Sequence, residues 1–309
     1  MTRVTENGAA GAHRRTLSFG LAGTGFWAQA VHAPALASTT GIELSAVWGR
    51  NPLAAGALAD GFGATAHSDF GTFLADVDAV AFCMPPDVQS SLAVQAASAG
   101  RHVLLEKPVA TAKAASDALV QAVDDAQVAS MVFFTARFQP EVRAWLASVK
   151  DQTWTAGHAV WLGSALSGSS PFDTPWRREK GGLWDLGPHA VSLLWASLGP
   201  VVSVIADAGH PDVSHLILRH ERGATSTVTT TLHGPETADG LDLYLWGDHG
   251  RSAAPLQADD PVGAMRVALT ELADNARSGH LAHPCDVHFG RDVTTVLAQA
   301  QQQINARQG

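Results

Sequence analysis

The first 134 residues alternate short apolar runs with helical stretches, and this alternation constrains the fold more than any other feature of the chain. The runs are largely apolar, and in the run 103–105 no polar residue alternates with the apolar ones, which is typical of a strand buried on both faces of a sheet. Because the connections are short, the pattern predicts a doubly wound, mostly parallel sheet over residues 16–134. The predicted strands are 17–22, 42–48, 78–84, 103–106 and 128–134, and the predicted helices include 52–62, 87–98 and 112–126.

The pattern changes from about residue 135. A helix that begins at residues 137–140 is followed by strands in succession, which predicts a second domain of α+β type with an open, mainly antiparallel sheet over residues 135–309. Residues 1–15 are polar and small and are expected to form a disordered tail. The strands of the second domain are expected at 157–163, 201–206, 213–219, 224–232 and 241–246, and helices at 261–276 and 287–306.

Composition excludes several classes of function. The formal net charge of −9 at pH 7 argues against a nucleic-acid binder that relies on neutralising phosphates. The 14 histidines show no paired ligand spacing, so no metal site is predicted. With two cysteines and no apolar run long enough to cross a membrane, the chain is expected to be a soluble cytoplasmic protein without a membrane partner.

A glycine turn follows the first predicted strand. The order strand, G-x-G-x-x-A and helix is typical of a turn whose backbone N–H groups approach a pyrophosphate, so residues 16–134 are interpreted as a dinucleotide-binding Rossmann domain. Glycine turns are common, and this one alone is a weak signal. Pro34 is expected to break or kink the helix after about two turns. The residues of the turn are Gly23, Thr24, Gly25, Phe26, Trp27 and Ala28.

The end of the second predicted strand bears on cofactor choice. Where an NAD site has an acid for the ribose 2′-hydroxyl, this chain has Trp48-Gly49-Arg50-Asn51. Gly49 leaves room, and Arg50 could pair with a 2′-phosphate through its fork of donors, which favours NADP over NAD. The alternative is that Arg50 is a surface arginine and that cofactor choice is relaxed.

A lysine follows the apolar run 103–105, in the sequence Glu106-Lys107-Pro108. Pro108 cannot continue the strand, so Lys107 is expected at the carboxyl end of a central strand, the edge where open α/β sheets bind ligands. An amine held partly out of water there can exchange protons near neutral pH. The simpler interpretation is a solvated lysine in an ordinary loop.

The second half contributes a loop at 163–182, which holds Trp176 beside Arg177, and then Asp185 and His189. Loops of this length are usually functional or disordered. Asp185 and His189 are four residues apart, so they are expected to stack on one face at the start of a helix, where the acid can fix the histidine tautomer. The alternative is an N-capping Asp185 and a structural histidine.

Taken together, these motifs resemble the glucose-fructose oxidoreductase / inositol dehydrogenase (Gfo/Idh/MocA) family. The resemblance covers the chain from about residue 17 to residue 300. It implies a Rossmann domain followed by a domain with an open sheet, NAD(P)-dependent oxidation or reduction of a sugar, polyol or related compound, and homodimers or homotetramers joined through that sheet. The motifs are Gly23-x-Gly25, Asp78-Ala-Val, Pro85-Pro86, residues 99–108, Arg137-Phe138 and Gly181-Gly182 to His189.

The resemblance also implies roles for individual residues. Lys107 falls on the catalytic lysine of the family, and Asp185 and His189 fall on its active-site acid and histidine. Gln89 stands where many members have histidine, and Ser192 where aspartate is frequent, which leaves substrate contacts open. The residues implied in cofactor binding are Gly23, Thr24, Gly25, Phe26, Trp27, Gly49, Arg50, Asn51, Pro85, Pro86, Gln89, Glu106 and Lys107.

The expected reaction is hydride transfer at a carbinol carbon, with His189 as the first choice for the hydroxyl proton. Lys107 would stabilise the same oxygen or exchange the proton itself, and Asp185 would orient His189 or hold a second hydroxyl. Arg137, Trp176 and Arg177 are expected to line the substrate pocket. Two alternatives stay open: a non-catalytic dinucleotide-binding sensor of the same fold, and a reductase of a non-sugar double bond.

Overall fold

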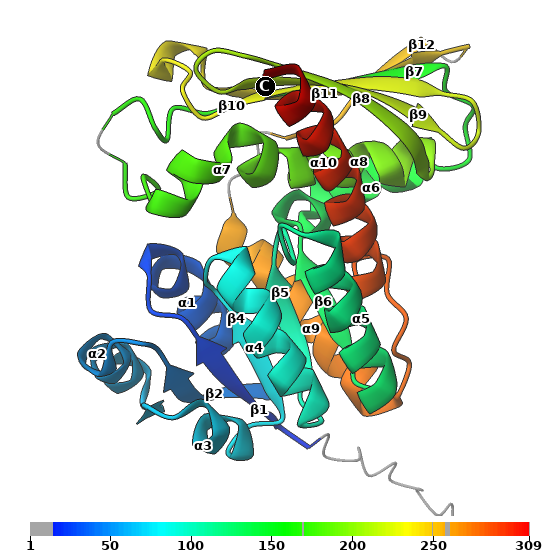
Figure 1. The fold of residues 1–309 in the computed structure, drawn as a ribbon. Helices are drawn as coiled ribbons and strands as arrows, with labels where there is room; N and C mark the ends of the chain where they lie inside the picture. Colours follow the sequence, from blue (N-terminus) through cyan, green and yellow to red (C-terminus); the bar gives the residue numbers. More distant parts are fainter. Residues whose placement is uncertain (1–14, 169, 249, 257–259, 309) are drawn as a thin grey trace, which may run out of the picture.

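The computed structural model describes residues 15–168, 170–248, 250–256 and 260–308. Two six-stranded sheets form separate lobes, with helices between them (Figure 1). The predicted tail lies outside the described residues except for Arg15, whose guanidinium binds the Asp78 carboxylate at 2.9 Å. No helix among the described residues is long and apolar enough to cross a membrane.

The first sheet has the strand order β3-β2-β1-β4-β5-β6, and every pair in it is parallel. Its central strands are mostly apolar because helices cover both faces. The predicted doubly wound sheet is therefore confirmed. The strands are β1 (Leu17–Ala22), β2 (Ile42–Trp48), β3 (Thr65–His67), β4 (Ala79–Phe82), β5 (His102–Glu106) and β6 (Ser130–Phe133).

The helices of this lobe differ from expectation in two details. The chain stays helical past Pro34, because a π-helical turn at Ala28–His32 leads directly into α1. Helix α4 begins at Pro86, so Asp87 lies in its first turn and does not cap it. The helices are α1 (Ala33–Ser38), α2 (Pro52–Phe62), α3 (Phe70–Ala75), α4 (Pro86–Ser98) and α5 (Lys113–Ala126).

The second sheet has the order β12-β11-β7-β10-β9-β8. Its pairs are antiparallel except for β7 with β10, so the mainly antiparallel sheet is confirmed with one parallel pair. Buried and exposed residues alternate along β9, as expected for one covered face. The strands are β7 (Ala156–Leu162), β8 (Val201–Gly209), β9 (Val213–His220), β10 (Thr225–Thr231), β11 (Gly240–Gly247) and β12 (Gly250–Ala253).

The helices at 175–185 and 187–198 lie between the two sheets in Figure 1. The predicted loop 163–182 is shorter than expected, because a helix with a proline in its first turn begins at residue 175. The elements are two 3₁₀ turns, Thr135–Phe138 and Glu236–Ala238, and the helices α6 (Pro140–Val149), α7 (Pro175–Asp185), α8 (Gly187–Leu198), α9 (Pro261–Ser278) and α10 (Val287–Gln308).

The last two helices connect the lobes. Helix α9 packs against α1, β5 and β6 of the first lobe, and α10 contacts both α5 and β8. The domain boundary expected at residue 135 stays a prediction. Residues 261–278 belong to the second predicted domain by sequence but pack against the first sheet. Gly290 lets α10 approach that sheet closely, since a Cβ there would lie 2.6 Å from Val109 Cγ1 and 3.0 Å from Val132 Cγ2.

We expect Gly290→Ala to lower the free energy of unfolding by about 1–3 kcal/mol, because the added methyl group overfills a packed contact. Gly61→Ala on α2 is the matched control: no atom lies within 4 Å of the place its Cβ would take, so this change should leave stability unchanged or raise it by up to about 1 kcal/mol. Denaturant unfolding measures both. Equal stability of Gly290→Ala and the parent chain would contradict the packing described for α10.

Candidate active site

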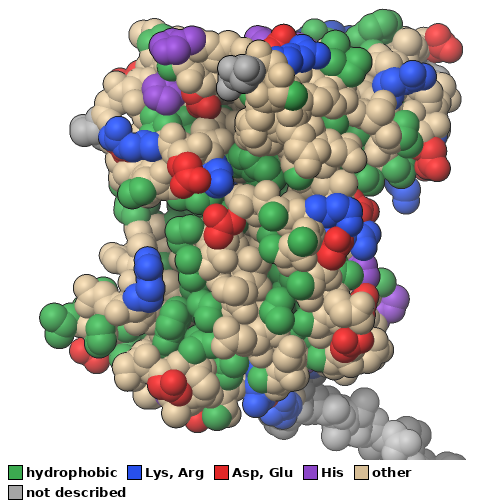
Figure 2. Space-filling view, viewed as in Figure 1, with side chains coloured by type: hydrophobic (Ala, Val, Ile, Leu, Met, Phe, Trp, Pro, Cys, Tyr) green, Lys and Arg blue, Asp and Glu red, His purple; other side chains and the backbone are tan. Residues whose placement is uncertain are grey.

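A cavity of about 680 Å³ lies where the carboxyl ends of the first sheet meet α7 and α8. Segments that follow β1, β4, β5 and β6 line one side of it, and residues of the second lobe line the other. The surface in Figure 2 is indented between the two lobes at the left, on the side where α1 and α7 face each other in Figure 1. The cavity therefore occupies the edge at which open α/β sheets bind ligands.

Lys107 enters this cavity from the end of β5, and its peptide bond to Pro108 is cis. The buried amide of Gln89 fixes this end of the strand. Its Nε2 donates to the Glu106 and Pro108 carbonyls at 2.8 and 3.3 Å, and its Oε1 accepts from the Glu106 backbone N–H at 2.8 Å. Gln89 therefore positions Glu106 and Lys107 and does not itself line the cavity.

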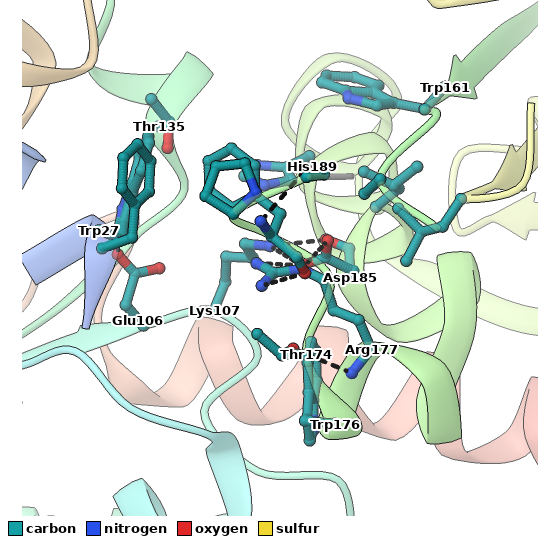
Figure 3. Close-up of a pocket in the computed structure, with 18 of the residues that line it drawn as sticks. Trp27, Glu106, Lys107, Thr135, Trp161, Thr174, Trp176, Arg177, Asp185 and His189 are labelled. Carbon is teal, nitrogen blue, oxygen red and sulfur yellow. Dashed lines mark hydrogen bonds and ion pairs between the residues drawn. The ribbon is translucent and has the colours of Figure 1, made fainter. Parts of the chain in front are cut away.

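Asp185 is the partner of Lys107 (Figure 3). The Lys107 Nζ donates to Asp185 Oδ1 at 2.8 Å and to its backbone carbonyl at 2.7 Å, and Arg177 Nε donates to Oδ2 at 2.7 Å. Burial disfavours the charged carboxylate, but Lys107 and Arg177 together hold the pKa of Asp185 well below its usual range. Both carboxylate oxygens are thus occupied by cations.

A break in α7 sets the position of Asp185. Gly181 has φ +66°, and a Cβ there would collide with the Asp212 carboxylate, which accepts the Gly182 N–H at 3.0 and 3.1 Å. The same carboxylate accepts the Leu232 N–H at 2.9 Å, which ties α7 to the end of β10. The pair of glycines is therefore required by a left-handed turn and a close approach.

His189 does not share a helix with Asp185, contrary to expectation. Asp185 ends α7, whereas His189 lies in the first turn of α8, and no hydrogen bond joins their side chains in the described part of the chain. The imidazole instead stacks on Trp161, with ring centroids 5.7 Å apart and planes 14° apart. Burial, with Lys107 and Arg177 nearby, lowers the pKa of His189 to about 3 despite the opposing Asp185, so the ring is neutral.

The glycine turn forms the opposite side of the cavity. Gly23 has φ +130° and lies so close to the Cys83 carbonyl that no side chain fits, whereas Gly25 has no atom within 4 Å of a Cβ position and lines the cavity. Glu106 accepts from Trp27 Nε1 at 3.1 Å and bonds His32 Nε2 at 2.9 Å. An open glycine at the start of a helical segment fits a pyrophosphate, so this side can hold a dinucleotide.

Phe172 of the second lobe reaches across to this turn. Its ring meets Phe26 and Trp27 edge-on, with centroids 5.3 and 5.8 Å away, and its carbonyl accepts from Arg177 Nη1 at 3.3 Å. Because Arg177 also holds Asp185, the contact links the glycine turn to the acid of the site.

Other residues predicted for the site lie outside the cavity lining. Arg137 is not among the cavity-lining residues: its Nη1 donates to the Ser192 carbonyl at 3.1 Å and its guanidinium lies over Phe289, so its contact with a substrate stays a prediction. Gly23, Thr24, Gly49, Arg50 and Asn51 surround the turn and the end of β2 without lining this cavity. The predicted residues that do line it are Gly25, Phe26, Trp27, Pro85, Pro86, Glu106, Lys107, Trp176, Arg177, Asp185 and His189.

Sequence reasoning missed Trp161, Phe172 and Thr174. Trp161 lies in a predicted strand, where an aromatic residue is typical of core, and the sequence contains no signal that it stacks on His189. Thr174 caps α7, with its hydroxyl accepting the Arg177 N–H at 3.4 Å. A Thr-Pro step is a recognisable helix start, so this residue could have been found from the sequence.

The two sides of the cavity have separate chemistry. The glycine-turn side fits a dinucleotide, and the other side holds a neutral histidine beside a lysine, which can move a proton. This combination defines the class of dinucleotide-dependent oxidoreductases. No group of three or more metal-ligating side chains occurs among the described residues.

The chain belongs to the GFO/IDH/MocA family of oxidoreductases. Residues 17–134 match the oxidoreductase family model with an NAD-binding Rossmann fold, and residues 152–252 match the GFO/IDH/MocA C-terminal domain. Inositol 2-dehydrogenase of Rhizobium meliloti is 28% identical over 256 residues, which cover 78% of this chain and 76% of that protein. D-xylose 1-dehydrogenase (NADP(+)) 2 of Haloferax volcanii is 30% identical over 209 residues, which cover 63% of each chain.

A solved oxidoreductase domain protein from Kribbella flavida has the same fold. The TM-score is 0.84 at 22% identity, over 95% of this chain and 98% of that one.

We expect the His189 imidazole to stay neutral from about pH 8 down to about pH 5, because its surroundings disfavour a further cation. The unfolded chain takes up this proton below the ordinary value of 6.5 and the folded chain only near 3, so the contribution of His189 to stability is lost as the pH falls between these values. Histidine NMR, with the signal assigned by its loss in His189→Gln, measures the titration. A midpoint near 6.5 would contradict the described environment.

Proposed function

We propose that this chain transfers a hydride between a nicotinamide, with NADP preferred, and a carbinol carbon of a sugar, polyol or related compound. The observation that carries the proposal is the meeting of Lys107, from the first lobe, with Asp185 and His189, from the second, in one cavity beside the glycine turn. These groups come from distant parts of the chain, and the combination of a cation with a neutral base is what alcohol oxidation requires.

In the proposed mechanism the bound nicotinamide supplies the hydride acceptor or donor. Neutral His189 accepts the hydroxyl proton, and Lys107 donates a hydrogen bond to the same oxygen through the N–H that Asp185 leaves unused. Lys107 and Arg177 disfavour a positive charge on His189. As the hydroxyl loses its proton, negative charge develops on the substrate oxygen and offsets these two cations, so His189 becomes more basic during the reaction. Asp185 holds Lys107 in place, and Arg177 holds Asp185.

NADP preference is supported by the end of β2. Residue 49 is glycine, so no carboxylate for a ribose 2′-hydroxyl stands at this position, and a Cβ there would lie 2.8 Å from the methyl group of Thr24. Arg50 is exposed, and the Asn51 side-chain oxygen caps α2 by accepting the Leu53 N–H at 3.0 Å. The relative from Haloferax volcanii is named for NADP(+).

We also propose that the chain forms a homodimer or homotetramer through the uncovered face of the second sheet. Large apolar side chains are exposed there, with Ile205 and Ile217 paired across β8 and β9 at 54% and 48% exposure, and Trp246 at 47%. Exposed large apolar side chains on one face of a sheet favour an interface at that face. A cytoplasmic location stays a prediction.

The main test is turnover of sugars, polyols and keto compounds with NADP(H), followed by nicotinamide absorbance. We expect Lys107→Ala to lower kcat/KM about a hundredfold or more while NADPH binding changes only a few-fold, because the lysine acts on the reacting oxygen. Lys113→Ala is the matched control, since this lysine is exposed on α5 and pairs with Asp117.

The alternatives give different results in the same assay. Dinucleotide binding without turnover of any compound would favour a sensor, and turnover confined to imines or enones would favour a reductase of a non-sugar double bond. Full turnover by Lys107→Ala with unchanged NADPH affinity would remove the lysine from the mechanism.

We expect Arg50→Ala to weaken NADPH binding about tenfold or more and to leave NADH binding unchanged, because a charge-assisted hydrogen bond to the 2′-phosphate is lost. Arg222→Ala, at an exposed turn between β9 and β10, controls for the loss of a surface charge. Fluorescence titration with NADPH and with NADH measures the ratio of their dissociation constants. If this ratio is the same in Arg50→Ala and the parent chain, Arg50 plays no part in cofactor choice.

A further inference from the structure

One wall of the cavity is apolar and lies entirely in the second lobe. Trp161 near the end of β7 pairs directly with Leu241 at the start of β11, so their side chains share one face of the sheet. Leu232, which follows β10, and Leu256 line the same cavity. Leu241 lines the cavity and is 36% exposed, so its hydrocarbon side chain is accessible to a bound ligand. Trp161, Leu232, Leu241 and Leu256 together are named the apolar wall.

The apolar wall begins directly beside the proton acceptor. Trp161 stacks on His189 at 5.7 Å, and Leu241 lies next to Trp161 on the neighbouring strand. Leu232 and Leu256 line the same cavity. A substrate whose hydroxyl reaches His189 must therefore place a neighbouring part of its structure against the wall.

Several polar side chains of this half of the cavity, Asp239 among them, already make a hydrogen bond within the chain and keep further hydrogen-bonding capacity. The Ser164 hydroxyl donates to Asp239 Oδ2 at 2.7 Å, and the Ser170 hydroxyl accepts the Phe172 N–H at 3.2 Å. Thr174 caps α7, as described above. Trp176 also lines this half of the cavity, and its indole nitrogen is buried without a hydrogen-bond partner among the described residues.

A free polyol would leave several hydroxyl groups facing hydrocarbon here, and each buried hydroxyl without a partner costs free energy. A substituent made of carbon and hydrogen gains free energy from the same surface. We propose that the substrate of this enzyme is a sugar derivative that carries an alkyl or aryl substituent, such as a glycoside with an apolar aglycone, and that the apolar wall binds this substituent. The inference rests on the proposed function and names its substrate class.

The experiment compares each aldose of a panel as the free sugar and as its methyl, n-butyl and phenyl glycosides, with saturating NADP⁺. We expect kcat/KM to rise about tenfold or more from methyl to phenyl, since added apolar contacts in a pocket discriminate on that scale. Equal or higher kcat/KM for the free sugars would overturn the inference.

Leu241→Ser tests the wall itself. We expect it to lower kcat/KM for the phenyl glycoside about tenfold more than for the methyl glycoside, a change in ratio that a general loss of folding would not produce. Leu53→Ser is the matched control, because Leu53 is 85% exposed on α2 and does not line the cavity. A phenyl-to-methyl ratio that is the same in Leu241→Ser and the parent enzyme would exclude the wall as the binding surface.

Failure of this inference differs from failure of the proposed function. Turnover of free sugars without a gain from the substituent rejects the inference and retains the dehydrogenase. When no sugar is turned over, phenyl β-D-glucoside is titrated against the NADPH-loaded protein by tryptophan fluorescence. Saturable binding that Leu241→Ser weakens supports the apolar wall independently of turnover, and its absence rejects the wall.

Discussion

The ion pair between Lys107 and Asp185 is the interaction on which the site depends, because it joins the two lobes across 78 residues of sequence. Both side chains are nearly buried, at 11% and 9% exposure, so neither charge is well solvated without the other. Removing one partner of such a pair leaves an uncompensated charge, which is strongly destabilising. The pair therefore forms only when the two lobes are packed together as described. Arg177, on the same helix as Asp185, forms a second ion pair with this carboxylate.

Most of the first sheet can be predicted because its information is local. Each strand is an apolar run bounded by a turn, and parallel strands covered on both faces need no alternation of polar residues. Lys107 can be placed at a sheet edge for the same reason: Pro108 ends the run. The succession of strands without crossover helices predicts an antiparallel second sheet. It does not reveal that β7 and β10 are parallel neighbours, because α7, α8 and two further strands separate them in the sequence.

The candidate site differs from expectation in the directions of several side chains. A spacing of four between Asp185 and His189 suggests one helix face, but α7 ends at Asp185 and α8 begins at Gly187, where Pro188 lacks the N–H that would continue the first helix. The motif assigns Arg137 to the pocket, whereas its guanidinium is held by Phe289 and a backbone carbonyl. Gln89 likewise does not line the cavity, and its side chain binds the backbone of Glu106 and Pro108. The directions of Arg137 and Gln89 depend on neighbours that the sequence does not bring together.

The division of the cavity into a charged part and an apolar part has a consequence for specificity. In the proposed mechanism Lys107, held by Asp185 and Arg177, acts on one oxygen of the substrate and would treat any secondary alcohol alike. Discrimination must therefore come from the rest of the lining, and hydrophobic contacts discriminate among substituents by modest factors for each added group. An enzyme built this way accepts a family of related compounds rather than one, with the order of preference set by how completely a substituent covers Trp161 and Leu241.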